Sequence, residues 1–197
     1  MNEDEQVISH VLAGDTEAYR LLVSRLLVSR HECLVFGFVQ NLVRNSADVE
    51  DIAQEVFVAA FTHLDSFDPK RAKFSTWLLT IARNRCCNFL KRRSRTTGEL
   101  GELVCDAASP EMNVVDGETW SRLDAALDRL SLEQRTAFVL AEIQELPLAE
   151  IAAIEGVPLG TVKSRLSRAK ENLRRELKDL QPSEADFVRP FSQRGAT

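Results

Sequence analysis

The chain carries few residues that break a helix, and this feature constrains its fold more than any other. Its 197 residues include 8 glycines and 6 prolines. Apolar side chains recur at the 3.6-residue spacing of amphipathic helices along almost the whole length, which predicts an all-α protein. With 44% hydrophobic residues, the chain has enough apolar surface for one or two cores.

One segment interrupts the helical pattern. Residues 96–118 contain three glycines, one proline, six acidic residues and no lysine or arginine. We interpret this segment as a flexible acidic linker between two small helical domains, at 1–95 and 119–180. The polar stretch 181–197 is interpreted as a frayed tail.

Charge and cysteine content narrow the class of protein. The formal net charge is −5, and no run of apolar residues approaches the ~18 needed to cross a bilayer, so we expect a soluble protein without membrane insertion. The acidic start, MNEDEQ, is the reverse of a signal peptide and favours the cytoplasm. Cys33, Cys86, Cys87 and Cys105 form no Cys-x-x-Cys pair, so we expect four reduced thiols, no metal site and no cofactor.

Residues 21–30 contain the five-residue unit LLVSR twice in succession. Five residues make about 1.4 turns of helix, so a second copy rotates the residues that follow by roughly 140°. Either a break or bulge absorbs this rotation, or the repeat arises by chance in a leucine-rich helix.

The clearest amphipathic helix is predicted at 46–64. Its apolar residues fall on one stripe, made of Val49, Ile52, Ala53, Val56, Phe57, Ala60 and Phe61. Asp48, Asp51 and Glu55 line an opposing edge. Spacing alone leaves two interpretations of this edge open, a solvated acidic face and a docking surface for a basic partner.

The most basic stretch of the chain comes next. It begins in a loop, 65–73, where Asp68-Pro69 indicates a turn, and continues in a helix predicted at 74–93. Its cations include Lys70, Arg71, Lys73, Arg83, Arg85, Lys91, Arg92 and Arg93, interleaved with Phe74, Trp77 and Phe89. Aromatic side chains beside a cationic track hold single-stranded nucleic acid. A tryptophan inside a helix more often packs in the core, so both interpretations stay open for Trp77.

The C-terminal unit contains a motif for two closely packed helices. Ser131 and Gln134 form a capping box that starts one helix. In the sequence 147–173, Pro147 and Pro158 start two further helices and Gly156 supplies the turn between them.

The second helix of this motif has a polar, basic outer face. That face carries Thr161, Lys163, Ser164, Arg165, Arg168 and Lys170. Arginine and lysine on such a helix reach phosphates and guanine edges in a major groove, and small residues at Gly160 and Thr161 let backbone N–H groups approach a phosphate. We interpret 148–175 as a DNA-binding helix-turn-helix.

Three motifs in this order resemble those of the extracytoplasmic-function (ECF) sigma factors, the minimal class of the sigma-70 family. DVEDIAQEVFVAAF (48–61) resembles the family's core-polymerase-binding helix, and FSTWLLTIARNRCCNFLKRR (74–93) resembles its helix for −10 recognition and strand opening. PLAEIAAIEGVPLGTVKSRLSRAKENL (147–173) resembles its −35-binding helix-turn-helix. The resemblance implies a non-enzymatic initiation factor that binds core RNA polymerase and promoter DNA and is controlled by an anti-sigma factor.

The resemblance also implies roles for individual residues. Asp48, Asp51, Gln54 and Glu55 match positions that dock on the clamp helices of the polymerase β′ subunit, and the β subunit is a further implied contact. Loop 65–73 matches the loop that helps to hold a flipped −10 base, and Asn84 matches a residue of that pocket. The implied −10 residues are Lys70, Arg71, Lys73, Trp77, Arg83, Asn84, Asn88, Lys91 and Arg92. The implied −35 residues are Gly160, Thr161, Lys163, Ser164, Arg165 and Arg168.

Three other features are interpreted through the resemblance. The acidic linker matches the segment that family members thread through the polymerase toward the RNA exit path. The LLVSR repeat looks like five residues more than the family has. Ser167 stands where many relatives have a bulkier side chain, so one −35 contact is expected to differ.

Two other classes of function are alternatives to a sigma factor. A stand-alone helix-turn-helix regulator that dimerises on a palindromic site explains 148–175 but leaves the acidic and basic helices without a role. An enzyme acting on nucleic acid would need clustered carboxylates, a glycine-rich phosphate loop or a nucleophile–base set, and the spacing supports none of these.

Overall fold

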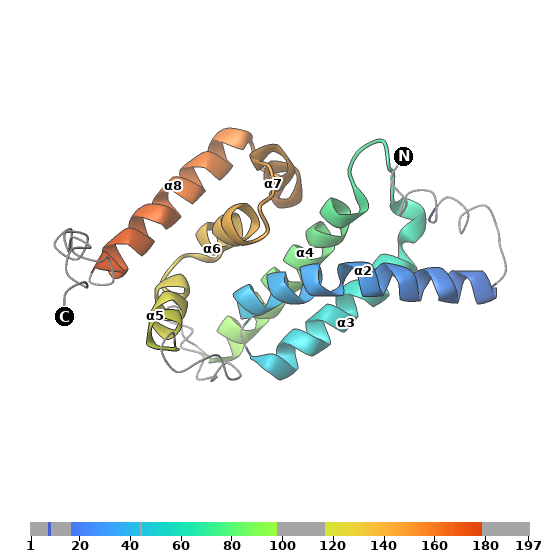
Figure 1. Cartoon of the computed structure of the whole chain (residues 1–197), viewed down its shortest axis with the longest axis horizontal. Coiled ribbons are helices and arrows are strands. Elements are labelled where there is room, and N and C mark those ends of the chain that lie inside the picture. The colour runs from blue at the N-terminus through green and yellow to red at the C-terminus, as the bar shows by residue number, and fades with distance from the viewer. Residues whose placement is uncertain (1–7, 9–16, 44, 98–116, 179–197) are drawn as a thin grey trace, which may run out of the picture.

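The computed structural model describes residue 8 and residues 17–43, 45–97 and 117–178, and every element in these ranges is helical. The N-terminal half contains α2 (Glu17–Val43), α3 (Ser46–Thr62), the short 3₁₀ turn η1 (Leu64–Ser66) and α4 (Phe74–Thr97). The C-terminal half contains α5 (Gly117–Asp128), α6 (Leu132–Phe138), the π-helical segment η2 (Val139–Ile143), α7 (Leu148–Glu155) and α8 (Leu159–Glu176) (Figure 1). The all-α prediction is confirmed. Most of the predicted linker, the predicted tail and Cys105 lie outside the described residues.

The LLVSR repeat lies within α2, and this helix runs without a break from Glu17 to Val43. Of the two alternatives, a break or bulge does not occur in this helix. Among the described side chains of α2, Leu26 is 37% exposed whereas Leu27 is fully buried. The buried stripe then continues through Val35, Phe38, Val39, Leu42 and Val43. Leu27, in the second copy of the repeat, thus lies on the same side of α2 as this buried stripe.

The N-terminal half is a bundle in which α2, α3 and α4 pack on one another (Figure 1). The predicted stripe of α3 is confirmed, because its aliphatic members are buried and its two phenylalanines pack against the core. The Asn45 side chain caps this helix by accepting the N–H groups of Ala47 and Asp48, at 3.1 and 3.4 Å. The helix ends at Thr62, two residues before its predicted end at 64, and Leu64 lies in η1.

The C-terminal half begins as predicted and then departs from a regular helix. The Ser131 hydroxyl caps α6 by accepting the Gln134 N–H at 3.3 Å. Beyond Phe138 the backbone widens into η2, where the Gln144 N–H donates to the Val139 carbonyl, five residues back, at 2.9 Å. The sequence did not indicate this π-helical segment, because the apolar pattern of 138–140 is compatible with a regular helix.

The turn of the helix-turn-helix is built around Gly156. This residue has φ +65°, in the left-handed region that favours glycine. The Gly156 N–H donates to Ala153 and the Val157 N–H to Ala152, at 3.3 and 3.1 Å, which is the Schellman pattern that closes α7. Pro147 and Pro158 immediately precede α7 and α8, as predicted.

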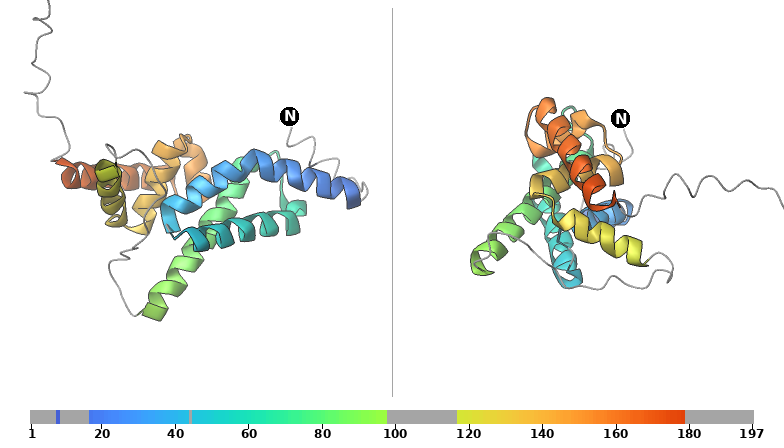
Figure 2. Two further views of the ribbon diagram at one scale, coloured as in Figure 1. Left: turned by 60° about the horizontal axis from the view of Figure 1, so that its bottom comes forward. Right: turned by 90° about the vertical axis from the view of Figure 1, so that its left-hand side faces the viewer.

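The two halves pack against each other through α7 on α4 and α6 on α2 (Figures 1 and 2). Buried residues of the C-terminal half join the same continuous cluster as α2, α3 and α4, namely Val139, Leu140, Ile151, Ile154 and Val162. A second, smaller cluster lies between α5 and α8. The shared cluster was not predicted, because periodicity within one helix carries no information about which distant helix covers it.

Candidate nucleic-acid interface

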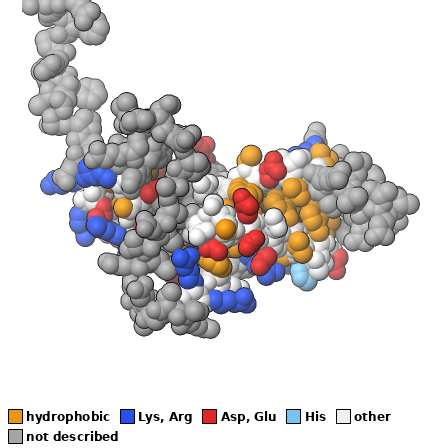
Figure 3. Space-filling model, turned by 90° about the horizontal axis from the view of Figure 1, so that it is seen from below, with side chains coloured by type: hydrophobic (Ala, Val, Ile, Leu, Met, Phe, Trp, Pro, Cys, Tyr) orange, Lys and Arg blue, Asp and Glu red, His pale blue; other side chains and the backbone are white. Residues whose placement is uncertain are grey.

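The acidic edge of α3 is on the surface, but its members differ in their partners. Asp51 and Gln54 are exposed, and no cation of the described residues pairs with Asp51. Asp48 pairs with Arg93 and Glu55 with Arg85, each at 3.3 Å. The face seen from below carries acidic and apolar side chains side by side (Figure 3). Asp51 and Gln54 are therefore the residues of this edge that lose the fewest internal contacts when a partner docks.

Val58 is a member of this edge that the sequence reasoning missed. Its side chain is 65% exposed, and it lies seven residues after Asp51 and three after Glu55. These spacings place all three on one face of a helix. An apolar centre with a charged rim is the usual composition of a protein interface. A helical projection of 46–64 would have found Val58, since it is a large apolar residue outside the core stripe.

The loop before α4 is held in place at both ends. The Asp68 side chain accepts the Lys70 N–H at 2.9 Å, and the Asp68 carbonyl accepts the Arg71 N–H at 3.0 Å, which confirms the predicted turn. Phe67 packs against the rings of Phe74 and Trp77, with ring centroids 5.5 Å apart in both pairs. This anchoring leaves the side chains of Lys70 and Arg71 exposed.

The aromatic residues interleaved with these cations are mostly structural. Phe74 is buried, so it is unavailable as a stacking surface for bases. Trp77 and Phe89 are half-buried and pack against the core. Part of the Trp77 surface is open to solvent, and its ring is fixed by contact with Phe67 and Phe74.

One face of α4 presents the remaining −10 candidates to solvent. Asn84, Asn88, Lys91 and Arg92 are exposed and follow one another at i, i+4, i+7 and i+8. These spacings put them on a single stripe. Arg83 borders the stripe, and its Nη1 donates to the Asn84 side-chain oxygen at 3.2 Å.

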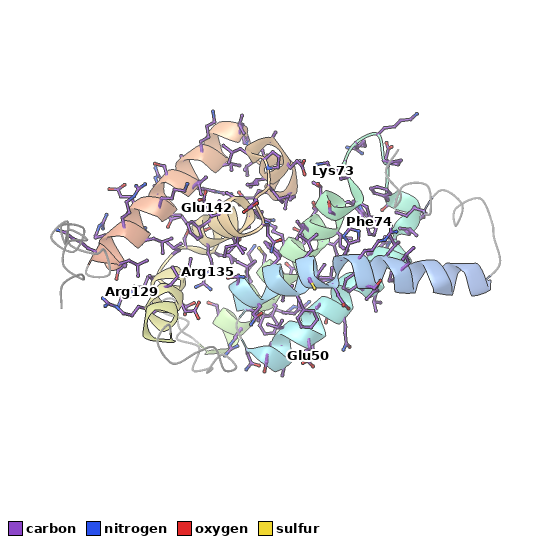
Figure 4. All side chains as sticks on the ribbon, in the orientation of Figure 1. Glu50, Lys73, Phe74, Arg129, Arg135 and Glu142 are labelled. Atoms are coloured by element: carbon purple, nitrogen blue, oxygen red, sulfur yellow. The ribbon has the colours of Figure 1, made fainter. Side chains whose placement is uncertain are left out.

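Another face of α4 is covered by α7 (Figure 4). Lys73 Nζ and Thr76 Oγ1 each donate to a different carboxylate oxygen of Glu150, both at 2.8 Å. The hydrogen bond from Lys73 is the main cause of a lowered pKa for Glu150, and Thr76 adds to it. Lys73, predicted to face DNA, is thus held by a glutamate more than seventy residues away. No local pattern in the sequence points to Glu150.

The outer face of α8 presents most of the −35 candidates. Val162, Ala169 and Leu173 are buried on its inner side, whereas Gly160, Lys163, Ser164, Ser167 and Arg168 are exposed and Thr161 is half-exposed. A Cβ added at Gly160 would meet no atom within 4 Å, so nothing inside the chain requires glycine there. The open space leaves room for a ligand at the start of this helix.

Arg165 and Lys170, which the sequence predicts on the outer face of α8, are each held by a glutamate. Arg165 is half-buried, and its guanidinium pairs with Glu155 of α7. Burial raises the pKa of Glu155, and this arginine opposes that rise. Lys170 pairs with Glu142 at 2.8 Å. Lys163, Ser164 and Arg168 remain the exposed side chains of the predicted DNA-reading set.

The cysteines show no feature of a reactive or metal-binding site in the described ranges. Burial raises the pKa of the Cys86 thiol to about 12 and also raises that of Cys87. Cys33 is exposed and unpaired with another cysteine. No group of three or more metal-ligating side chains is found there, and no described helix is both long and apolar enough to span a membrane.

A basic helix beside a helix-turn-helix, on one all-α chain with an exposed acidic helix, defines a DNA-binding protein of the transcription machinery. The model of sigma-70 region 2 matches residues 27–96, which include α3 and α4. The model of sigma-70 region 4 matches residues 120–173, which include the helix-turn-helix. The chain belongs to the ECF sigma factors of the sigma-70 family.

Characterised relatives agree over nearly the whole length. The chain is 34% identical to the ECF RNA polymerase sigma factor SigW of Bacillus subtilis, covering 88% of this chain and 96% of that protein. It is 32% identical to the ECF RNA polymerase sigma-E factor of Escherichia coli, over 90% and 95% of the two chains. The chain is therefore a sigma factor that recognises promoters for RNA polymerase, and the stand-alone regulator is not favoured.

Two solved structures share the fold. The sigma factor RpoE bound to the anti-sigma factor NepR, from Bartonella quintana, superimposes with a TM-score of 0.66 at 27% identity, over 78% of this chain and 96% of that one. CnrH bound to the cytosolic domain of CnrY superimposes with a TM-score of 0.68 at 23% identity, over 92% and 100% of the chains. At that lower identity, the second likeness concerns the fold alone.

Proposed function

We propose that this sigma factor uses three helices for three separate tasks. The exposed edge of α3, with Asp51 at its centre, docks on the β′ clamp helices of core polymerase. Loop 65–73 and α4 open the −10 region and hold its displaced strand, and the outer face of α8 reads the −35 duplex. The observation that carries the proposal is the exposure of Lys163, Ser164 and Arg168 above the buried side of α8. The protein itself catalyses no reaction.

The proposed function also implies partners for this sigma factor and the compartment in which it acts. The acidic linker 96–118, which lacks cations, threads through a basic channel of the polymerase. One solved sigma factor of this fold, RpoE of Bartonella quintana, was captured with the anti-sigma factor NepR. We propose that an anti-sigma factor also binds this chain. The chain acts in the cytoplasm, where transcription takes place.

Run-off transcription with core polymerase on a library of promoter sequences tests the function directly. The expected result is transcripts from a subset of templates that share both a −35 and a −10 sequence, with none from core polymerase alone. Tight, specific binding of promoter duplex by the free protein, without transcripts when polymerase is added, would support the stand-alone regulator instead.

Arg168→Ala tests the −35 assignment. If its guanidinium contacts a guanine by two hydrogen bonds, the substitution should cost about 1–3 kcal/mol of binding free energy at the cognate −35 element and relax specificity at one base pair. The measurement is holoenzyme binding to −35 duplexes that differ at single positions. Arg175→Ala, in the last turn of the same helix, is the matched control and should leave base preference unchanged. A uniform loss over all sequences would make Arg168 a phosphate contact.

Asn84→Ala tests the −10 assignment. Asn84 is exposed on α4, so its side chain contributes little to packing. We expect slower opening at cognate −10 sequences, measured by fluorescence of 2-aminopurine in the −10 region, with −35 binding unchanged. Gln40→Ala, at an exposed position of α2, serves as the control. Equal loss of opening and of −35 binding would argue against a direct role for Asn84.

A further inference from the structure

The helix that we propose reads DNA, α8, is held to its neighbours by ion pairs on both borders of its buried side. That buried side consists of Val162, Ala169 and Leu173. Arg165 pairs with Glu155 of α7, and Lys170 pairs with Glu142 of η2 at 2.8 Å (Figure 4). Arg165 and Lys170 are five residues apart, or about 140° around the helix, and the buried residues fall within this arc. The two ion pairs therefore flank the apolar contact of α8.

Glu155 occupies a position where a carboxylate needs a partner. Its side chain is 1% exposed, and it is the last residue of α7, where the helix dipole repels negative charge. Burial raises the pKa of this carboxyl, and the hydrogen bond and charge of Arg165 are the largest effects that oppose the rise. The charge of Arg83 opposes it with a smaller effect, and that of Glu133 adds to it. Arg165 is therefore the main group that stabilises the charged form of Glu155.

Arg165 also differs from the exposed cations of α8. Its side chain is 23% exposed, whereas Lys163 and Arg168 are exposed and pair with no carboxylate in the described part of the chain. To reach a DNA phosphate, Arg165 would have to leave the buried Glu155 without its partner, and breaking a buried pair in this way is strongly unfavourable. The ion pair therefore favours a role for Arg165 within the helix-turn-helix over a contact with DNA.

An ion pair at the border of the buried side controls how α8 is rolled about its own axis. Side-chain ends lie roughly 6 Å from a helix axis, so a roll of about 20° moves them by about 2 Å. Two hydrogen bonds to one base tolerate much less displacement than this. Apolar packing is non-directional, whereas a hydrogen-bonded guanidinium and carboxylate meet in a defined geometry. The pair of Arg165 with Glu155 is thus placed to fix the roll of α8.

We propose that Arg165 is a positioning residue for −35 recognition: its pair with Glu155 holds α8 at the roll angle that presents the DNA-reading side chains to the major groove. Those side chains are Lys163, Ser164 and Arg168. Arg165 stays paired with Glu155 when DNA is bound, and it contacts neither a base nor a phosphate. This inference rests on the proposed −35 role of α8 and adds a residue that acts through the orientation of that helix.

The test compares Arg165→Met with the double variant Glu155→Met, Arg165→Met. The double variant replaces the buried pair by apolar side chains, a change that proteins commonly tolerate. The quantity measured is base discrimination, the ratio of holoenzyme affinities for a cognate and a scrambled −35 duplex. We expect Arg165→Met to lower discrimination about tenfold, and the double variant to recover it to within about threefold of the unmutated chain. A double variant as defective as Arg165→Met, or a single variant with full discrimination, would contradict the proposal.

The dependence of affinity on salt separates positioning from a phosphate contact. Loss of one phosphate contact lowers the steepness of log affinity against log salt concentration by about 0.9. We expect the same steepness for the unmutated chain and for both variants. A decrease of this size in Arg165→Met and in the double variant would make Arg165 a phosphate contact and would overturn the proposal.

Two controls test whether the effect belongs to this pair. Arg174→Met removes an exposed arginine from the last turn of α8 and should leave discrimination unchanged. Lys163→Met should lower discrimination, and adding Glu155→Met should not restore it. A loss in Arg174→Met equal to that in Arg165→Met, or a restoration of Lys163→Met by Glu155→Met, would show a general effect and overturn the proposal.

Two further outcomes have a defined meaning. Circular dichroism checks the helical content of each variant. If Arg165→Met does not fold, the double variant decides, because it also lacks the guanidinium and must still keep both discrimination and salt dependence. If the unmutated holoenzyme shows no −35 discrimination, the proposed function fails and this inference fails with it, whereas the defects described above for the variants overturn the inference alone.

Discussion

Replacing Asp51 with arginine is expected to weaken binding to core RNA polymerase by at least about 100-fold, because like charges brought together at an interface cost several kcal/mol. Asp51 is exposed on α3, and no cation of the described chain pairs with it. Its reversal therefore removes no internal contact and leaves the fold intact. The substitution should therefore weaken only the binding of the docking partner, which the proposed function identifies as the β′ clamp helices.

Asp65→Arg is the control for this experiment. Asp65 is exposed in η1, beyond the end of α3, and the substitution makes the same change of charge. Holoenzyme assembly is measured by fluorescence anisotropy of the labelled sigma factor titrated with core polymerase, in the absence of DNA. Raising the salt concentration should shrink the difference between the two variants. Assembly of Asp51→Arg at the strength of the unmutated chain would refute the assignment of α3.

Replacing Arg135 with methionine should lower the free energy of unfolding by about 2–4 kcal/mol, since it strands buried acceptors that the guanidinium now satisfies. Arg135 is 8% exposed and donates to the Leu127 carbonyl at 2.9 Å, to the Leu42 carbonyl at 3.3 Å and to the Asp128 carboxylate at 2.7 Å. Two of these acceptors lie in the last turns of α5 and α2, where carbonyls lack a partner within the helix; the Leu127 carbonyl also accepts the Leu130 N–H at 3.2 Å. One side chain thus closes the ends of two helices from different halves.

Arg129→Met is the matched control, because Arg129 is 67% exposed and has one ion pair, with Glu176 (Figure 4). A surface pair of this kind is worth about 1 kcal/mol or less. Urea denaturation followed by circular dichroism compares the two variants. Equal losses for both would mean that the buried network around Arg135 adds nothing beyond a surface contact.

Features that depend on nearby residues could be predicted from the sequence. The core stripe of α3, the cap at Ser131, the turn at Asp68 and the left-handed Gly156 all follow from residues within a few positions of one another. The helix-turn-helix was found for the same reason, since its spacing is fixed by two short helices and one turn. Local chemistry alone decides such elements.

Features that depend on tertiary packing could not be predicted. The LLVSR repeat indicated a rotation of the residues that follow it, but α2 continues through the repeat without a break, and Leu27 in its second copy is buried. The π-helical segment follows α6, which contacts both α2 and α8. Phe74 was grouped with surface aromatics although it lies in the core beside Phe67. In each case the partner that decides the outcome is distant in sequence.

The candidate site residues divide in the same way, into those that nearby residues place and those that tertiary contacts place. Exposure of Asp51, Asn84 and Arg168 agrees with roles on a surface, and periodicity had already separated them from the core. The positions of Lys73 and Arg165 were beyond sequence reasoning, because Glu150 and Glu155 hold them. The functional assignments themselves stay predictions that the substitutions above are designed to test.

The carboxylate of Glu150 and the ammonium of Lys73 belong to one polypeptide, and this determines how their contact depends on the amount of protein. Two groups tethered to one chain meet at an effective concentration that is independent of how much protein is made. The fraction of molecules in which α7 contacts α4 is therefore the same at every protein concentration. Only a ligand with higher affinity for the form in which the two helices are apart shifts this fraction.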